Sequence, residues 1–338
     1  MTANAETATG SPGRSPMTIK KVVIGVDIWG NVAETVKERF PDIDVVLEPD
    51  AEKVVAQLAD ADAYTGFRLS AEQLDRAPEL KWVHSLSAGV EQWLNAGIAE
   101  RGLLLTNSSG VHATNIAEHV FAMMLAFARQ LPSLFGSQQQ HQWRDNDTFD
   151  EHVFELEGQK LIIVGTGAIG SAVARRAKAF DMATVGVRRH PSAEPIPNID
   201  EQLSFEEMRE HLGDADHVVI CLPMTSETKG LFSADVIAAM KPGAHFFNIG
   251  RGGIVDQDAL IAALRSGHLG GAGLDVTTPE PLPGDSPLWD MPNVIITAHT
   301  SGSTPKYGER ALGLFGDILE RLRDGREPIN VVDPEAGY

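Results

Sequence analysis

Three glycines in the middle of the chain have the spacing of a phosphate-binding turn. Gly165, Gly167 and Gly170 follow the apolar run Leu161–Val164 and precede the helical pattern of Ser171–Phe180. Between a strand and a helix, the first glycine permits a tight turn, the second admits a pyrophosphate close to the backbone, and the third lets helix and strand pack closely. Free N–H groups at the start of the helix favour phosphate. The motif therefore predicts a dinucleotide-binding site.

Two arginines follow the next predicted strand, Ala183–Val187. Arg188 and Arg189 stand where a site selective for NAD usually has an acidic residue that binds the ribose 2′-hydroxyl. An acid there would repel the 2′-phosphate of NADP, whereas a guanidinium binds it with charge-assisted hydrogen bonds. We therefore expect NADP(H) as the preferred cofactor, with NAD(H) as the alternative.

One histidine lies where a reacting group is expected. His299 follows the apolar run Val294–Ala298, which predicts a strand. Ligands of α/β sheets bind beyond the C-terminal ends of the strands, and histidine is the side chain that most readily exchanges a proton near neutral pH. We therefore interpret His299 as a functional residue rather than a structural one.

The elements that must position these residues alternate between strands and helices. In the first half, the apolar and β-branched runs predict strands, and the helical spacing predicts helices at 31–40 and 51–58; the strands are Lys21–Val26, Val45–Leu47, Ala63–Phe67 and Trp82–Ser85. A second run of such units extends from Lys160 to about Thr297. This alternation predicts the α/β class with two parallel sheets.

Three further segments complete the predicted outline. Asn115–Leu131 predicts a long apolar helix, with Asn115 as its N-cap and Glu118 three residues on. The polar stretch 136–151 predicts a loop or linker, and Lys306–Arg323 predicts an amphipathic helix. Because the long helix is more apolar than one small domain needs, we expect it at the interface of a homodimer.

The composition narrows the class of protein. The 338 residues carry a formal net charge of −19, which disfavours binding to nucleic acid. Cys221 is the one cysteine, so a disulfide framework and a cysteine-rich zinc site are excluded, and no metal site is expected. The sequence has no apolar run of the ~18 residues that a membrane span needs. We expect a disordered tail at residues 1–17 and a cytoplasmic enzyme.

Four segments in combination resemble the D-isomer-specific 2-hydroxyacid dehydrogenase family, in its order and spacing. They are 165–170, Asn248–Asp256, Leu274–Leu282 and His299–Gly302, and Ser87–Val90 is similar to the family's substrate loop. The likeness covers essentially Lys20–Val332. It implies two Rossmann-like domains, one flavodoxin-like and one dinucleotide-binding, with a cleft between them.

The resemblance also implies roles for single residues. His299 is similar to the acid/base, Glu280 to the carboxylate that holds and charges it, and Arg251 to the arginine that binds the substrate carboxylate and carbonyl oxygen. Ala88 and Gly89 match the backbone that binds the substrate with Arg251. The residues implied in cofactor binding are Gly165, Thr166, Gly167, Ala168, Ile169, Gly170, Arg188, Arg189, Leu222, Pro223, Thr228, Ile249, Gly250, Asp275, His299 and Gly302.

The implied reaction interconverts a small 2-keto acid and its D-2-hydroxy acid. The chain stops at Tyr338 and is in this respect similar to glyoxylate/hydroxypyruvate reductases rather than to the longer phosphoglycerate dehydrogenases. Two alternatives stay open: an NAD(H)-sensing binding protein similar to a corepressor, and a related dehydrogenase acting on phosphoglycerate or phosphite. The expected substrate domain is discontinuous, 18–111 and 299–338, with the dinucleotide-binding domain at 112–298 inserted in it.

Overall fold

The computed structural model describes residues 15–27, 31–143, 153–191 and 193–337. Contacts divide the chain into two compact units: unit 1 runs to Val111 and resumes at Pro305, and unit 2 is His112–Thr304. The second crossing therefore follows Thr304, a few residues after the boundary expected at 298. Of the expected tail, residues 1–14 lie outside the described residues, whereas the Met17 N–H donates to the Leu322 carbonyl at 2.8 Å.

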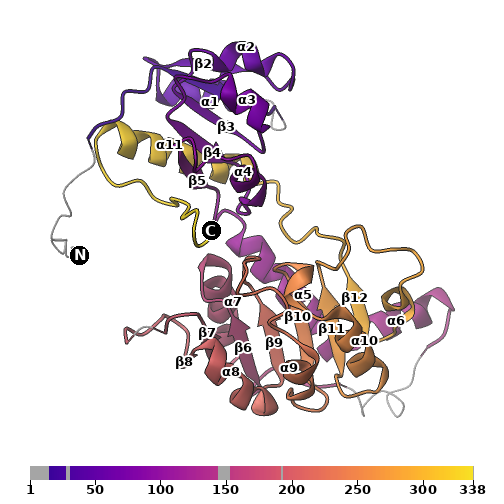
Figure 1. Ribbon diagram of the computed structural model, residues 1–338. Coiled ribbons are helices and arrows are strands. Elements are labelled where there is room, and N and C mark those ends of the chain that lie inside the picture. The colour runs from indigo at the N-terminus through magenta and orange to yellow at the C-terminus, as the bar shows by residue number, and fades with distance from the viewer. Residues whose placement is uncertain (1–14, 28–30, 144–152, 192, 338) are drawn as a thin grey trace, which may run out of the picture. The chain divides into compact units, whose positions relative to one another are not determined.

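Unit 1 contains a five-stranded parallel sheet with the order β2-β1-β3-β4-β5 (Figure 1), which is the flavodoxin-like order. Its strands are β1 Lys21–Ile24, β2 Asp44–Leu47, β3 Ala63–Gly66, β4 Trp82–Ser85 and β5 Leu104–Asn107, and its helices are α1 Val32–Arg39, α2 Val54–Leu58, α3 Ala71–Asp75, α4 Glu91–Asn95 and α11 Tyr307–Arg323. The C-terminal α11 belongs to this core, because Phe315 stacks on Trp82 of β4 with ring centroids 4.9 Å apart.

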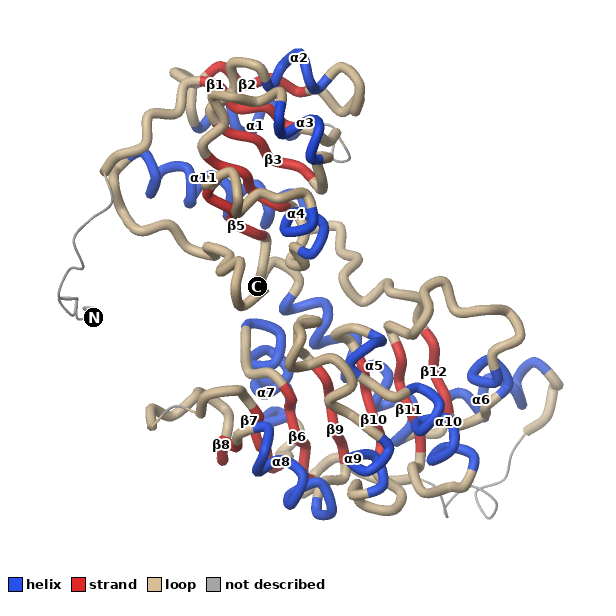
Figure 2. The backbone as a smooth tube through the Cα atoms, in the orientation of Figure 1, coloured by secondary structure: helices blue, strands red, loops and turns tan. Residues whose placement is uncertain are grey.

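Unit 2 contains a seven-stranded parallel sheet with the order β12-β11-β10-β9-β6-β7-β8 (Figure 2). Its strands are β6 Lys160–Val164, β7 Ala183–Val187, β8 Glu201–Leu203, β9 His217–Ile220, β10 His245–Asn248, β11 Gly271–Leu274 and β12 Val294–Ile296. Six of them follow the Rossmann order and β12 adds an edge. The predicted α/β class with two parallel sheets is confirmed.

Helices cover both faces of the unit 2 sheet, so its central strands β6 and β9 are mostly apolar. In β6, Leu161 and Ile163 pack toward α5 (Ala113–Ala128) and α7 (Ala168–Ala179), and Ile162 and Val164 pack toward the opposite face. That face is covered by α8 Phe205–His211, α9 Ala234–Ala238 and α10 Gln257–Arg265. The continuous run Leu161–Val164 is therefore a strand buried on both sides.

Two local predictions were wrong. Helix α5 begins at Ala113 with His112 as N-cap, and Asn115 instead donates from Nδ2 to the Ser301 carbonyl at 2.8 Å. Gln130 has a φ of 54°, which ends α5, and α6 (Leu131–Gln139) then covers the start of the stretch expected to be a linker. The rest of that stretch, from residue 144, lies outside the described residues.

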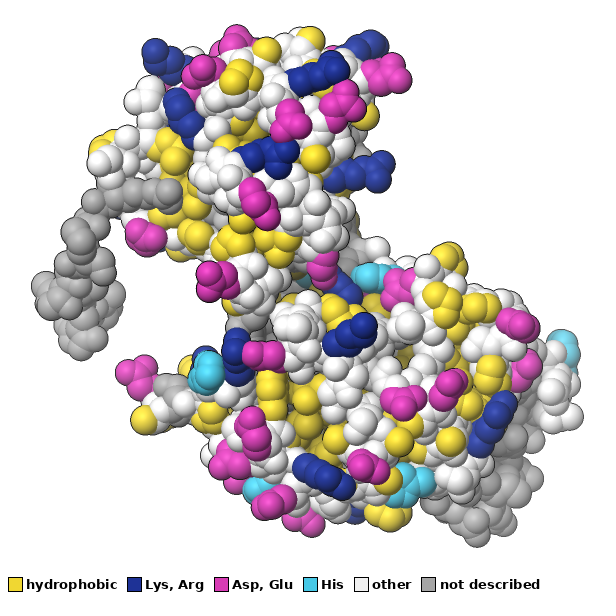
Figure 3. All heavy atoms as spheres, in the orientation of Figure 1, with side chains coloured by type: hydrophobic (Ala, Val, Ile, Leu, Met, Phe, Trp, Pro, Cys, Tyr) yellow, Lys and Arg dark blue, Asp and Glu magenta, His cyan; other side chains and the backbone are white. Residues whose placement is uncertain are grey.

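Among the described residues, no single helix has the length and hydropathy of a membrane span, although α5 and α6 reach them together across a 68° bend. In the same part of the chain, no three His, Cys, Asp or Glu side chains are grouped as metal ligands. Figure 3 shows acidic side chains spread over both units on the visible face, in keeping with the net charge of −19.

Candidate active site

The predicted site residues of unit 2 follow the C-terminal ends of neighbouring strands. In sheet order, His299 lies beyond β12, Asp275 follows β11, Arg251 lies beyond β10, Leu222 beyond β9, and the glycine motif follows β6 (Figure 1). Because all these strands are parallel, their C-terminal ends lie on one edge of the sheet. The fold thus brings segments more than 130 residues apart in sequence to the edge where α/β proteins bind ligands.

His299 and Glu280 form a direct pair. The Nδ1 atom of His299 lies 2.8 Å from Oε2 of Glu280, and the other carboxylate oxygen accepts the Thr277 N–H at 3.1 Å. The histidine side chain is 53% exposed, and no described residue forms a hydrogen bond with its Nε2. The pair therefore fixes Nδ1 as the atom facing the carboxylate and leaves Nε2 to exchange a proton with a bound molecule.

Asp275 holds the backbone that presents His299. Ala298 and His299 have φ values of 46° and 57°, a backbone conformation that residues other than glycine rarely adopt. The buried Asp275 carboxylate accepts hydrogen bonds from the Thr297 hydroxyl at 2.7 Å, the Thr300 N–H at 2.9 Å and the Ser301 hydroxyl at 2.5 Å. The Asp275 carbonyl also accepts the His299 N–H at 2.6 Å. Together these hydrogen bonds can hold the backbone of Ala298 and His299 in its unfavourable positive-φ conformation.

The loop that carries Arg251 is held by Asn248. The Asn248 amide donates to the Arg251 carbonyl and accepts the Gly250 N–H, both at 3.0 Å, while Nη1 of Arg251 donates to the Gly250 carbonyl at 2.9 Å. A Cβ at Gly252 would lie 1.9 Å from the Thr277 carbonyl oxygen. Glycine at 252 therefore lets the Arg251 loop approach the loop that carries Glu280. The sequence-based prediction missed these supporting residues, although Asn248 lies in the motif that it quoted.

The glycine motif has the geometry of a nucleotide cradle. Gly165 has a φ of 101°, and a Cβ at Gly170 would lie 1.9 Å from the Gly165 carbonyl oxygen. At Gly167, the N-cap of α7, a Cβ would meet nothing within 4 Å. The backbone thus forms a tight turn with open space at the helix N-terminus, where phosphates bind. Thr166, Ala168 and Ile169 belong to this turn, and the residues present fit a dinucleotide.

The two arginines beyond β7 are in different situations. Arg189 forms an ion pair with Glu227, whereas no described residue pairs with the Arg188 guanidinium. Beyond β9, the buried Thr228 hydroxyl donates to the Pro223 carbonyl at 2.7 Å and accepts the Thr225 N–H at 2.8 Å. These two hydrogen bonds of Thr228 therefore hold the conformation of the loop beyond β9.

Three other predicted cofactor residues contact neighbouring loops. A Cβ at Gly250 would lie 2.6 Å from the Leu222 carbonyl oxygen, so the β9 and β10 loops touch there. Ile249, which precedes it, is buried. The Gly302 carbonyl lies 3.0 Å from Nδ1 of His112.

The comparison with known proteins decides the family. Residues 121–301 match the family profile described as D-isomer specific 2-hydroxyacid dehydrogenase, NAD binding domain. The chain belongs to this family. The resemblance noted in the sequence is confirmed, and the protein is an NAD(P)-dependent oxidoreductase.

Three relatives place this dehydrogenase within the family. It is 32% identical to glyoxylate/hydroxypyruvate reductase B of Pectobacterium carotovorum, over 88% of this chain and 90% of the relative. It is 34% identical to D-3-phosphoglycerate dehydrogenase of Mycobacterium bovis, over 81% of this chain, but it spans only 51% of that protein. A solved NADPH-dependent glyoxylate/hydroxypyruvate reductase from Sinorhizobium meliloti, in complex with NADP and sulfate, aligns with a TM-score of 0.80 at 29% identity, covering 94% of this chain and 100% of that one.

The predicted substrate residues Ala88 and Gly89 of the dehydrogenase lie in unit 1, beyond the C-terminal end of β4. The Asn107 side chain donates to the Ala88 carbonyl at 2.9 Å and so supports this loop. Their role in substrate binding stays a prediction.

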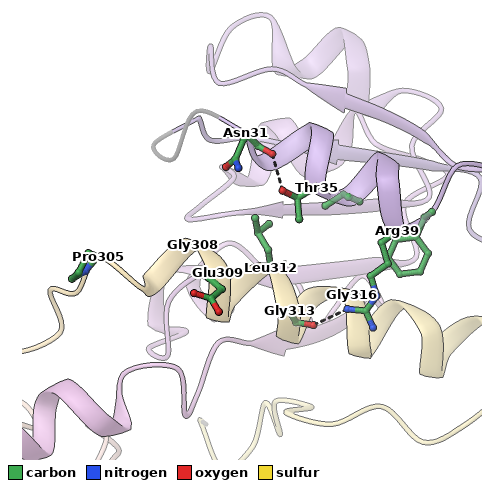
Figure 4. Close-up of a pocket in the computed structure, with 11 residues that line it drawn as sticks. Asn31, Thr35, Arg39, Pro305, Gly308, Glu309, Leu312, Gly313 and Gly316 are labelled. Carbon is green, nitrogen blue, oxygen red and sulfur yellow. Dashed lines mark hydrogen bonds between the residues drawn. The ribbon is translucent and has the colours of Figure 1, made fainter.

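Unit 1 also contains a cavity of about 470 Å³ between α1 and α11 (Figure 4). Thr35, Arg39, Glu309 and Leu312 are among the residues that line it. The Arg39 guanidinium donates to the Gly313 carbonyl at 3.2 Å and forms ion pairs with Asp317 and Glu320. None of the predicted site residues lines this cavity.

Proposed function

We propose that this dehydrogenase reduces a small 2-keto acid of the glyoxylate or hydroxypyruvate type to the D-2-hydroxy acid, and catalyses the reverse oxidation. The observation that carries the proposal is the His299–Glu280 contact of 2.8 Å. Glu280 lies in the loop after β11, and the neighbouring loop after β10 presents Arg251. A protein that only sensed NAD(H) would need the nucleotide cradle but not this proton-transfer pair. The corepressor-like alternative is therefore disfavoured.

The residues of the chain divide the chemistry as follows. The nicotinamide cofactor, when bound, supplies the hydride. The planar Arg251 guanidinium binds the substrate carboxylate and stabilises the negative charge that develops on the carbonyl oxygen. His299 donates a proton from Nε2 to that oxygen, and Glu280 stabilises the imidazolium that is present before the transfer. The N–H groups at Ala88 and Gly89 are the further groups that we propose to bind the carboxylate.

We propose that NADPH is the preferred cofactor and that Arg188 provides the preference. The guanidinium of Arg188 carries no ion pair among the described residues, and β7 is followed by no acid at this position. The NADPH-dependent reductase of Sinorhizobium meliloti at 29% identity supports the same cofactor. Charged hydrogen bonds contribute about 1.5–3 kcal/mol each, so one such bond corresponds to about a 10–100-fold preference.

The proposed function is tested by a panel of 2-keto acids with NADPH and NADH, using the purified protein. We expect turnover with glyoxylate or hydroxypyruvate and a higher kcat/KM with NADPH. 3-Phosphohydroxypyruvate belongs in the panel, because the similarity to a D-3-phosphoglycerate dehydrogenase favours it as the second candidate. A preference for the phosphorylated substrate would replace the proposed substrate class and leave the dehydrogenase assignment in place.

We also propose a cytoplasmic homodimer that associates through α5 and the segment after it. Phe135 on α6 is 57% exposed and Trp143 is 93% exposed, so the segment that follows α5 carries exposed apolar side chains. Large exposed apolar side chains of this kind mark interaction surfaces when they cluster. Light scattering at micromolar concentration should give twice the chain mass of 36.4 kDa, and the mass of a monomer would refute the dimer.

A further inference from the structure

The ion pair between Arg189 and Glu227 joins the loops on either side of the glycine turn. Arg189 lies in the loop beyond β7, and Glu227 lies in the loop beyond β9. In the sheet, β6 and its glycine turn lie between these two strands (Figures 1 and 2). Neighbouring strands are about 4.8 Å apart, so the two loops start about 10 Å apart and reach across the C-terminal end of β6 to meet. The pair therefore lies over the strand end that the glycine motif extends.

The loop that presents Glu227 is held by its own hydrogen bonds. Thr225 and Thr228 bond to each other through the Thr225 N–H at 2.8 Å and the Thr228 N–H at 3.2 Å, on either side of Glu227. The Arg189 and Glu227 side chains are 45% and 46% exposed, so the ion pair itself is open to solvent. Exposed ion pairs of this kind are weak and exchange readily. The backbone that carries Glu227 is thus held in position, while the ion pair itself can open.

We infer that Glu227 is a specificity-determining residue that limits the preference of this dehydrogenase for a 2′-phosphorylated nucleotide. Its carboxylate occupies the Arg189 guanidinium and places a negative charge beside it, while Arg188 stays available. A 2′-phosphate must therefore compete with Glu227 for Arg189, whereas a nucleotide with a free 2′-hydroxyl meets no such competition. This inference rests on the proposed NADPH preference, but it concerns the size of that preference and not its existence.

The test is a titration of the protein with NADPH and with NADH, followed by cofactor fluorescence in the absence of any keto acid. Glu227→Gln keeps the shape of the side chain and removes its charge. We expect the ratio of the NADH Kd to the NADPH Kd to rise about 3–10-fold, because one more guanidinium becomes available at a partly exposed site. The matched control is Glu118→Gln, which removes the same charge from an exposed pair with Arg176 in the same unit.

Arg189→Ala in the Glu227→Gln background separates release of Arg189 from a general charge effect, as a double-mutant cycle. The added preference should disappear in the double variant. If Glu227→Gln changes the ratio no more than Glu118→Gln does, or if the gain persists without Arg189, the inference is wrong. Equal Kd values for both cofactors in the unmodified protein would instead refute the proposed NADPH preference, and the change caused by Glu227→Gln would still report on Glu227. Circular dichroism confirms that each variant is folded.

Discussion

At the scale of single residues, the proposed proton transfer depends on the contact between Glu280 and His299. The imidazolium is stabilised by the Glu280 carboxylate, whose oxygen lies 2.8 Å from Nδ1. Glu280→Gln removes that charge and keeps the hydrogen-bonding shape. We expect kcat/KM for keto-acid reduction to fall, because in the proposed mechanism the imidazolium loses the neighbouring negative charge that stabilises it. The measurement is kcat/KM for keto-acid reduction beside that of the unmodified protein, and an unchanged value would exclude the pairing.

A second prediction for a single residue concerns Arg188, to which we assign the proposed cofactor preference. Arg188→Asp removes one hydrogen-bond donor and adds repulsion against a 2′-phosphate, so the preference in kcat/KM should change from NADPH to NADH. Arg209→Asp on α8 makes the same charge change elsewhere in unit 2 and should leave the preference as it is. Should both variants show the same ratio as the unmodified protein, Arg188 has no part in cofactor choice.

At the scale of elements, much of the sheet could be predicted from the sequence, because continuous apolar runs such as Leu161–Val164 leave few alternatives to a buried parallel strand. The strands β4 and β7 have the expected bounds. Helix ends were less predictable: Asn115 has the residue type of an N-cap but bonds to Ser301, 186 residues away. The helix-capping propensity of a residue depends on its neighbours in sequence, so it cannot predict a hydrogen bond to a residue as distant in sequence as Ser301.

The proposed catalytic residues could be named from residue type and motif, while the contacts that hold them could not. Asp275 was assigned to the cofactor, yet its carboxylate bonds to Thr297, Thr300 and Ser301 in the loop of His299. The Arg189–Glu227 pair joins loops that only the sheet order brings together. In both cases the missing information is which strand ends are neighbours.

The contact between the Arg251 and Glu280 loops gives a prediction at this scale. Gly252→Ala would place a Cβ 1.9 Å from the Thr277 carbonyl oxygen, so the two loops must separate. Misplacement of a binding group by about 1 Å can cost about 100-fold in rate, and we expect kcat/KM for the keto acid to fall about 10–100-fold. Gly284→Ala is the matched control, since a Cβ there meets nothing within 4 Å. Equal activity of the two variants would show that the close approach has no role in catalysis.

At the scale of the whole molecule, buried histidines link stability to pH in both units. Burial lowers the pKa of His84 in unit 1 to about 3, of His217 in unit 2 to about 3, and of His245 in unit 2 to about 4. The unfolded chain binds protons at about pH 6.5, so it gains protons that the folded chain does not accept. Stability is therefore full above pH 6.5 and is lost as the pH falls from there toward 4.

Urea unfolding at pH 7.5 and pH 5.5 measures this loss. Each of the three histidines should lower the free energy of unfolding by about 1.4 kcal/mol over this interval. The carboxyl groups of Asp62 and Asp216 have lowered pKa values, so they titrate below this window. His84→Gln, whose amide can bond to Thr106 and Ser108 in place of the ring, should reduce the loss for unit 1. A loss of the same size in the variant would contradict the assignment to His84.

The proposed keto-acid reduction depends on His299 as the proton donor, and one measurement tests this role most directly. Steady-state reduction of hydroxypyruvate by NADPH is compared between the unmodified protein and His299→Gln, with the NADPH Kd determined separately for each. We predict turnover by the unmodified protein and a kcat about 10²–10⁴-fold lower in the variant, with the NADPH Kd changed far less. Near-normal turnover by His299→Gln, or NADPH binding with no turnover of any keto acid by the unmodified protein, would contradict the account.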